Sequence, residues 1–303
     1  MGSFFKQLYR YTHPRAYRHN ENLWPHMKIT RAETGEINTL KYRDEAIPLA
    51  DLSALRGKFS GSVMLAATGP SINEIDFSQH PSLPAMGVNG AWSLDKFLEF
   101  SFYVVVDMGF FDSRPEIISQ IINDTELTLF TTAHGIARII DNFGLENTHC
   151  SLALIEDAAF KIYQPSLKPM ELKSHYMNTS DTYFYPQRDD IGFTLDIRHG
   201  VFDTGTVVYW ALQIIAFLGY TQIFIIGLDM NNFDKPRFYE VDNNKLPTNL
   251  EGMIEGTIFP ALDHASRVLK EKEIEVINLS VNSSIPTKIF QKAGYNDTFI
   301  KKN

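Results

Sequence analysis

The sequence has few of the residues that build disulfides and metal centres. Among its 303 residues the only cysteine is Cys150, so no internal disulfide and no multi-cysteine metal site can form. We expect a reducing, cytoplasmic setting and a buried structural role for Cys150 rather than a nucleophilic one. No D-x-D or H-E-x-x-H motif is present, and the nine histidines are scattered along the chain. The sequence therefore predicts chemistry that needs neither a bound metal nor a cofactor.

Long apolar runs are missing as well. No stretch of about 18 apolar residues occurs, so no transmembrane helix is expected, and the N-terminus lacks the apolar segment of a signal peptide. The net charge of −8 at pH 7 argues against a general nucleic-acid binder, which needs a basic face. We therefore expect no nucleic-acid partner.

The N-terminal segment has the opposite charge from the rest of the chain. Between positions 1 and 31 the only acid is Glu21. The basic residues of this segment are Lys6, Arg10, Arg15, Arg18, Lys28 and Arg31, and six aromatic residues (Phe4, Phe5, Tyr9, Tyr11, Tyr17 and Trp24) lie among them. Two interpretations stay open. The segment is either an irregular arm packed on its own domain or on a neighbouring subunit of a homo-oligomer, or a segment that lies on an anionic membrane surface.

Segments typical of strands and helices alternate after a polar lead-in at residues 32–60. We expect strands at Ser62–Ala67, Ala85–Val88, Phe102–Asp107, Leu127–Thr131, Leu152–Ile155, Gln222–Leu228 and Ile274–Leu279. We expect helices at Arg114–Asn123, Ala133–Asn142, Thr204–Leu218 and about Glu255–Lys272. Several strands are continuous apolar runs, as in a sheet that is covered on both faces. The alternation predicts an α/β, Rossmann-like fold with a mostly parallel sheet, in which residues 1–60 form an arm and lead-in and residues 61–303 a single domain.

Two long segments break this alternation. Residues 157–202 are polar and aromatic, and residues 230–253 form a loop rich in Asn, Asp and Pro. Loops of this length in a compact α/β domain are usually functional. Ligands of open α/β sheets bind beyond the carboxyl ends of the strands, so we expect Thr68–Ser71, Asn89-Gly90 and Gly227–Asp229 to share one rim.

Three turns on this rim are candidates for ligand contact. Gly69-Pro70-Ser71 lets the backbone approach a ligand, with Ser71 able to cap the next helix, but it is neither a Walker loop nor G-x-G-x-x-G. Asp203-Thr204-Gly205-Thr206 precedes a strongly apolar helix, whose positive end can hold a phosphate or a carboxylate, unless Asp203 or Thr204 simply caps it. Asp229 ends a buried strand, where an acid commonly binds a ribose hydroxyl or caps the next turn.

The order of these motifs resembles a known group of enzymes. The motifs are "TGPSINEIDFS", "VNG", "YVVVD", "DTGTVVYWALQIIAFLGYTQIFIIGLDM", "RFYE" followed by "LP", and "INLS". This order resembles bacterial CMP-sugar glycosyltransferases over about residues 62–285. The sialyltransferases are the more distant members, and the lipopolysaccharide-core Kdo transferase family is the closer likeness. The resemblance implies the GT-A-like sheet variant of bacterial sialyltransferases with a lid sub-lobe at about residues 230–256.

The resemblance also implies roles for residues that bind the donor. Thr68, Gly69, Pro70 and Ser71 would form the first nucleotide loop, and Asn89 with Gly90 would contact the nucleotide. Thr204, Gly205 and Thr206 match the helix start that cradles the donor. Gly227 and Asp229 match the strand end near cytidine and ribose. Asp107 falls where the sialyltransferases have an Asn near the donor sugar, and we count it with Glu255, His264 and Tyr239 as a candidate catalytic residue.

Catalytic residues follow the resemblance less closely. Tyr239 matches a lid tyrosine that hydrogen-bonds the departing phosphate, whereas the position of a second lid tyrosine falls near Asn231. The general base of the sialyltransferases is a His near the end of the lid, where this chain reads "EGMIEGT". Glu251, Glu255 or His264 could replace it, and we favour Glu255. The sugar carboxylate would meet the N–H groups of Thr204–Thr206 or the side chain of Arg237.

These implications predict an inverting, metal-independent glycosyltransferase that moves Kdo from CMP-Kdo onto the inner core of lipopolysaccharide. It would work as a peripheral protein on the cytoplasmic face of the bacterial inner membrane, with the basic arm on the anionic surface. Three alternatives stay open: a sialyltransferase or other CMP-nonulosonate transferase, a pterin phosphokinase-like enzyme, and a catalytically inactive nucleotide-binding scaffold.

Overall fold

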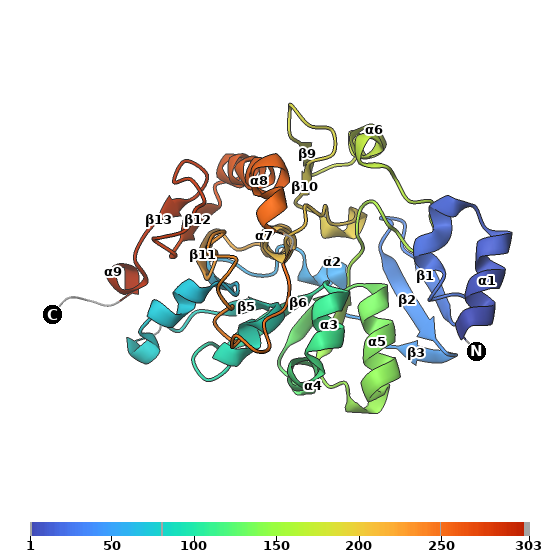
Figure 1. The fold of residues 1–303 in the computed structure, drawn as a ribbon. Coiled ribbons are helices and arrows are strands. Elements are labelled where there is room, and N and C mark those ends of the chain that lie inside the picture. The colour runs from blue at the N-terminus through green and yellow to red at the C-terminus, as the bar shows by residue number, and fades with distance from the viewer. Residues whose placement is uncertain (1, 80, 249, 300–303) are drawn as a thin grey trace.

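The apolar runs of the sequence form a parallel sheet at the centre of the molecule (Figure 1). The computed structural model describes residues 2–79, 81–248 and 250–299, so positions 1, 80, 249 and 300–303 of the predicted arm, lid and domain lie outside the described residues. The eight strands of the sheet have the order β13-β12-β11-β4-β5-β6-β7-β8, and every neighbouring pair is parallel. Their bounds are β4 Ser62–Ala66, β5 Ala85–Val88, β6 Phe100–Val105, β7 Thr128–Thr131, β8 Ser151–Leu154, β11 Gln222–Ile226, β12 Glu275–Asn278 and β13 Gln291–Lys292. The predicted α/β class and all seven predicted strands are confirmed; the short β13 was not predicted.

Both faces of the sheet are buried, which explains the continuous apolar runs. Val63 and Leu65 of β4 pack into one hydrophobic cluster, and Met64 and Ala66 pack into the other. Side chains alternate between the two faces of a strand, so a strand that is covered on both sides must be apolar at every position.

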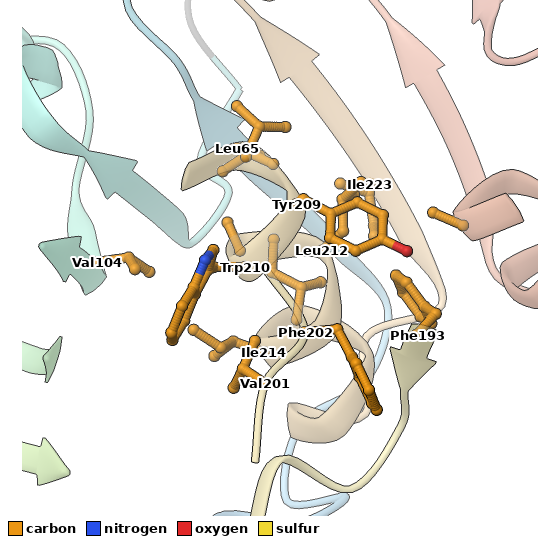
Figure 2. Close-up of a cluster of buried hydrophobic side chains, with 14 of the residues drawn as sticks. Leu65, Val104, Phe193, Val201, Phe202, Tyr209, Trp210, Leu212, Ile214 and Ile223 are labelled. Carbon is orange, nitrogen blue, oxygen red and sulfur yellow. The ribbon is translucent and has the colours of Figure 1, made fainter. Parts of the chain in front are cut away.

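One face is covered mainly by α7, Val207–Leu218, and α8, Phe259–Glu271. Figure 2 shows Trp210, Leu212 and Ile214 of α7 among side chains of the sheet such as Leu65 and Ile223. Ten of the 12 residues of α7 are buried, so this helix is apolar on nearly every side. A turn of π-helix, Ile254–Ile258, leads into α8. The helix predicted at Thr204–Leu218 thus begins three residues later, and the one predicted at about Glu255–Lys272 is confirmed.

The opposite face is covered by three helices that follow β6 and β7 in the chain. These are α3 Met108–Ser113, α4 Pro115–Asn123 and α5 Ala133–Phe143. Their apolar residues, among them Ile118 and Ile136, pack in the same cluster as Met64 and Tyr103 of the sheet. The predicted helices Arg114–Asn123 and Ala133–Asn142 are confirmed, and the structure adds α3.

The N-terminal arm is helical where the sequence suggested an irregular segment. Helix α1 spans Gly2–Thr12, and Phe5 and Tyr9, four residues apart, contact Trp24 with ring centroids 6.1 and 5.6 Å away. Residues four apart share a helix face, so burying these two rings favours a helix. The carboxylate of Glu21 accepts hydrogen bonds from Nη2 and Nε of Arg10, the former at 2.7 Å. The predicted irregular conformation of the arm is therefore wrong, whereas the predicted packing on its own domain is seen in contacts such as that of the Ser166 N–H with the carbonyl of Ala16.

The lead-in also has regular structure. A three-stranded antiparallel sheet comprises β1 Met27–Arg31, β2 Ile37–Tyr42 and β3 Glu45–Ile47, and the short helix α2 follows at Leu52–Leu55. Its apolar residues, including Ile37 and Leu40, share a buried cluster with the main sheet. The N–H of Ala50 donates to the carbonyl of Leu152 in β8, so the lead-in lies beside the β8 edge.

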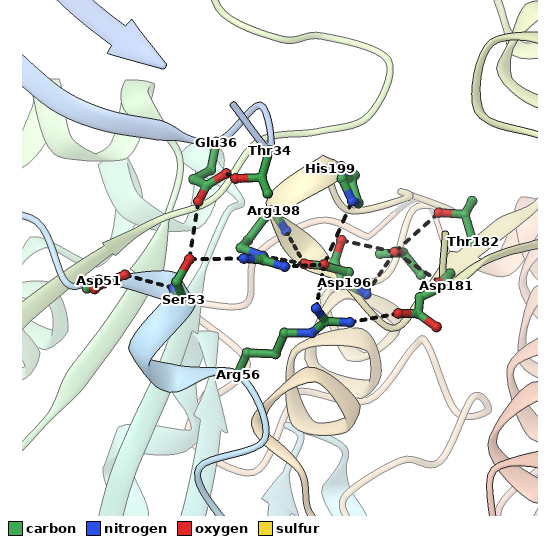
Figure 3. Close-up of polar contacts among 11 residues, drawn as sticks. Thr34, Glu36, Asp51, Ser53, Arg56, Asp181, Thr182, Asp196, Arg198 and His199 are labelled. Atoms are coloured by element: carbon green, nitrogen blue, oxygen red, sulfur yellow. Dashed lines mark hydrogen bonds and ion pairs between the residues drawn. The ribbon is translucent and has the colours of Figure 1, made fainter. Parts of the chain in front are cut away.

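Polar side chains tie this lead-in to the long segment after β8 (Figure 3). Asp196 is buried and accepts hydrogen bonds from Nε and Nη2 of Arg198 at 2.8 and 2.7 Å. Arg56 lies 3.5 Å from Asp196 and 2.7 Å from Asp181. Although burial opposes ionisation, the hydrogen bonds from Arg198 and the charge of Arg56 lower the pKa of Asp196. The network fixes residues 181–199 against the domain.

The two segments that interrupted the sequence pattern differ in structure. Residues 157–202 contain α6, Leu172–Tyr176, and an antiparallel hairpin of β9, Thr182–Phe184, and β10, Gly192–Thr194. Residues 227–248 contain neither helix nor strand.

The last described helix is α9, Tyr295–Phe299. No helix among the described residues is long and apolar enough to cross a bilayer.

Candidate active site at the carboxyl rim of the sheet

The strand order creates a switch point between β4 and β11. The chain runs outward from β4 to β8, and β11 then pairs with the other side of β4. In open α/β sheets such a switch leaves a crevice beyond the strand ends. A cavity of about 340 Å³ lies there. Its walls come from the ends of β4, β5, β6 and β11, from the start of α7 and from the predicted lid.

The first wall is the contact between the turn after β4 and the turn after β11. Asp229 is buried and accepts hydrogen bonds from both the N–H of Ser71, at 2.9 Å, and its hydroxyl. A Cβ at Gly69 would lie 2.4 Å from an oxygen of Asp229 and 2.6 Å from the carbonyl of Gly227, so only glycine fits. Ser71 lies inside the short 3₁₀ helix Pro70–Glu74, whose N-cap residue is Gly69, so it binds Asp229 and does not cap a helix. Thr68, Gly69, Pro70, Gly227 and Asp229 all line the cavity.

The second wall is Asn89, at the end of β5. Its backbone has a φ of 48°, which Asn tolerates better than most residues, and its carbonyl accepts a hydrogen bond from the hydroxyl of Tyr103 at 2.7 Å. The side-chain oxygen of Asn89 is buried and has no hydrogen-bond partner in the described part of the chain. Asn89 lines the cavity. A buried acceptor without a partner needs a donor from outside the protein chain.

The third wall is the start of α7. Asp203 accepts hydrogen bonds from the N–H of Gly205 at 3.0 Å and from Nε1 of Trp210 at 2.9 Å, so it orders the turn without capping the helix. Thr206 is the N-cap residue but makes no side-chain cap hydrogen bond, and Gly205 and Thr206 line the cavity. The hydroxyl of Thr204 is buried and lacks a partner among the described residues. An uncapped helix N-terminus facing a cavity suits an anion.

The lid adds positive charge to this site. Lys235, Arg237 and Lys245 all line the cavity. Glu240 is buried and accepts hydrogen bonds from Nη1 of Arg237 at 2.8 Å and from the N–H of Leu246 at 3.1 Å, which holds two parts of the lid together. Nζ of Lys245 donates to the carbonyl of Phe233. Polar contacts within the lid, and others from Arg114 to Glu240 and to the carbonyl of Asn244, therefore hold it over the rim, and its three cations line the cavity.

Tyr239 packs beside the rim, outside the lining of the cavity. Its ring packs against Gly90, where a Cβ would lie 2.2 Å from a ring carbon, and meets the ring of Phe110 edge-on at 6.4 Å. Burial raises the pKa of Tyr239 to about 12. Neither Tyr239 nor Gly90 is among the residues that line the cavity. In this structure the tyrosine anchors the lid to the rim.

The candidate general bases also lie apart from the cavity. Glu255 is exposed on the turn of π-helix, and neither it nor Glu251 lines the cavity. His264 is 4% exposed, its Nε2 lies 3.1 Å from the carbonyl of Tyr183, and burial lowers its pKa. Its side of α8 packs on the β9–β10 hairpin, which keeps the imidazole away from the cavity. Of the four residues predicted to be catalytic, only Asp107 lines the cavity.

Several cavity residues were missed by the sequence analysis. They include Met230, Asn232, Phe233, Lys235, Glu240, Lys245, Leu250 and Met253. The Asn- and Pro-rich composition of the loop predicted a lid, but no local pattern indicates which lid side chains turn toward the rim.

Cys150 is buried as expected, and burial raises the pKa of its thiol to about 12. The described residues contain no group of three or more His, Cys, Asp or Glu side chains that could hold a metal ion.

The chain is thus an α/β protein in which the uncapped start of α7 and three lid cations line one cavity at the carboxyl rim of the sheet. Residues 47–293 match the family described as 3-deoxy-D-manno-octulosonic acid transferase WaaZ, and the chain belongs to this family. It is therefore a Kdo transferase, and the predicted class of glycosyltransferase is confirmed. No curated protein matches the chain. Among solved structures, the sialyltransferase CstII from Campylobacter jejuni in complex with a substrate analogue, cytidine-5'-monophosphate, is similar, with 18% identity over 77% of this chain and 84% of that one and a TM-score of 0.40.

Proposed function

We propose that the protein transfers Kdo from CMP-Kdo to the inner core of lipopolysaccharide, with inversion at the anomeric carbon and without a bound metal. Membership of the Kdo transferase family identifies the transferred sugar as Kdo. The observation that carries the proposal is the convergence of the open N-terminus of α7, the unpaired oxygen of Asn89 and three lid cations on one cavity.

The charges of this cavity suit a CMP ester. CMP leaves as a nucleoside monophosphate, which carries less charge than a diphosphate. The N–H groups at the start of α7, together with Lys235 and Lys245, can compensate this charge in place of a cation. The carboxylate of Kdo is a second anion, and Arg237 can bind it while keeping its contact with Glu240.

The unpaired oxygen of Asn89 is the feature that favours a nucleoside or a sugar. An amide oxygen accepts hydrogen bonds, so its ligand must bring an N–H or O–H group. Cytosine has an exocyclic amino group, and both ribose and Kdo have hydroxyls.

Helix α1 has a face that fits the membrane in which the acceptor is anchored. Phe4, Leu8 and Tyr11 are 67%, 38% and 94% exposed, and their spacing puts them on one side of the helix. Arg15 and Arg18 follow and are exposed. Rings in the interface with cations at the headgroups are typical of peripheral proteins on anionic membranes. We therefore place the enzyme at the cytoplasmic face of the inner membrane.

The experiment is to incubate the full chain with CMP-Kdo and a truncated core lipid in the presence of EDTA and to measure the mass of the product. The proposal predicts a lipid that is heavier by one Kdo residue and the release of CMP at the same rate. A strict requirement for Mg²⁺, or transfer from CMP-sialic acid but not from CMP-Kdo, would contradict it.

A further inference from the structure

Among the described residues three carboxylates line the cavity, and two of them hold parts of the structure together. Asp229 is 6% exposed and both of its oxygens accept hydrogen bonds from Ser71. Glu240 is also 6% exposed, and it accepts hydrogen bonds from Arg237 and Leu246. Neither carboxylate can take a proton from a substrate without giving up contacts that join the turns of the site.

Asp107 is different in exposure and in contacts. It follows β6 at the N-terminus of α3, is exposed and lines the cavity. One oxygen, Oδ1, accepts hydrogen bonds from the N–H groups of Gly109 at 2.8 Å and Phe110 at 3.2 Å. The structure gives Oδ2 no partner among the described residues. The carboxylate is thus oriented by two backbone groups and keeps one oxygen for a substrate.

We propose that Asp107 is the general base of the transfer, a role that rests on the proposed function. Oδ2 accepts the proton of the acceptor hydroxyl while its oxygen forms a bond to the anomeric carbon of Kdo. The bond from that carbon to the phosphate oxygen breaks, and its electron pair leaves with CMP. The proton stays on Asp107 until solvent removes it, so charge and atoms balance.

The position of Asp107 along the rim agrees with this role. The proposed donor site lies at the ends of β11, β4 and β5, and Asp107 follows β6, the next strand along the sheet. The same direction along the sheet leads to β8 and to the lead-in, which binds β8 through Ala50 and the carbonyl of Leu152. An acceptor held in a membrane under the N-terminal arm would reach the cavity from the side of Asp107.

The decisive variant is Asp107→Asn. Asparagine keeps an oxygen for the N–H groups of Gly109 and Phe110, so α3 should remain capped, but it cannot take a proton. We expect kcat to fall by about 100-fold or more, while the KM for CMP-Kdo and the stabilisation by CMP stay within about threefold, because the phosphate contacts at the start of α7 are unchanged. Asp112→Asn is the matched control: it removes a carboxylate from the same helix that binds Arg138 outside the cavity, and it should keep full activity.

The outcomes separate this inference from the proposed function. If the wild type transfers Kdo and Asp107→Asn does so at a similar rate, Asp107 is not the base. If Asp107→Asn loses CMP-dependent stabilisation together with turnover, the residue binds the donor and the inference is also overturned. If the wild type transfers no Kdo, the proposed function is wrong, and the role of Asp107 as its general base is wrong as well. Comparison with Glu255→Gln completes the test, because a loss of kcat confined to that variant would assign the base to Glu255.

Discussion

Ser71 donates its backbone N–H and its hydroxyl to the two oxygens of Asp229, and this pair joins the end of β4 to the end of β11. The hydroxyl of Ser71 also lies 2.9 Å from that of Ser280, which follows β12. The ends of three strands are therefore held by one serine. The cavity exists because these turns are fixed at the switch point of the sheet.

This contact predicts that Ser71→Ala destabilises the protein. The substitution leaves one oxygen of a buried carboxylate without its donor, which costs about 1–3 kcal/mol in the free energy of unfolding. Chemical denaturation of the wild type and the variant measures this difference. Ser113→Ala, at an exposed position of α3, is the control and should change little. Equal stability of Ser71→Ala and the wild type would show that the pair does not hold the turns.

A second prediction concerns the unpaired side chain of Asn89. Glycine tolerates the positive φ of this position, and the side-chain oxygen has no partner among the described residues to lose. Asn89→Gly should therefore keep the melting temperature of the free protein close to that of the wild type but reduce the increase produced by CMP. Thermal melting with and without CMP measures both quantities. An unchanged CMP effect would mean that Asn89 faces the cavity without binding the ligand.

A third prediction concerns Asp157, beyond the end of β8. Burial raises its pKa to about 7, and the nearby charge of Asp203 adds to the effect, although the N–H of Ala159 donates to the carboxylate at 2.7 Å. The folded state thus binds a proton that the unfolded state releases near pH 4, so ionisation costs stability as the pH rises from about 4 to 7. Asp157→Asn should raise the melting temperature at pH 8, with a gain that disappears toward pH 4. A gain that does not depend on pH would contradict the raised pKa.

The exposed face of α1 gives a fourth prediction. Phe4→Ser combined with Tyr11→Ser removes two exposed rings without touching Phe5 or Tyr9, which pack on Trp24. Binding to vesicles that contain anionic lipid should weaken, whereas transfer to a water-soluble acceptor should not change. Phe97→Ser, another exposed ring far along the chain, is the control. Unchanged vesicle binding of the double variant would make α1 a structural element only.

The fold could be predicted well where burial on both faces of the sheet leaves continuous apolar runs in the sequence. The strands around "IFIIGLD" are apolar at consecutive positions because α7 and α8 cover one face and α3 to α5 the other. The lead-in gave no such signal, because the small sheet β1–β3 has one exposed face, with alternating polar positions in short strands. The arm was misjudged for a similar reason: burial of Phe5 and Tyr9 depends on Trp24, whose position the local sequence does not specify.

The site could be predicted at the strand ends but not in the lid. Gly69, Asn89, Asp107 and Gly227 follow strands directly, so the sheet alone brings them to one rim. The positions of Lys235 and Lys245 depend on the fold of the lid, in which Glu240 accepts hydrogen bonds from Arg237 and Leu246. These contacts lie within an irregular loop, and no local sequence pattern predicts them. Glu255 and His264 were assigned by motif order, and a turn of π-helix followed by packing on the β9–β10 hairpin separates them from the cavity.

The central claim is that a CMP ester binds this cavity, and the melting temperature of the full chain with equal concentrations of CMP, UMP and ADP tests it most directly. A ligand that binds only the native state raises the apparent stability by RT ln(1 + [L]/Kd), so at equal concentration the tightest ligand gives the largest increase. The account predicts the largest increase with CMP, and a smaller one with CMP for Asn89→Gly. Equal increases with all three nucleotides, or none with CMP, would contradict it.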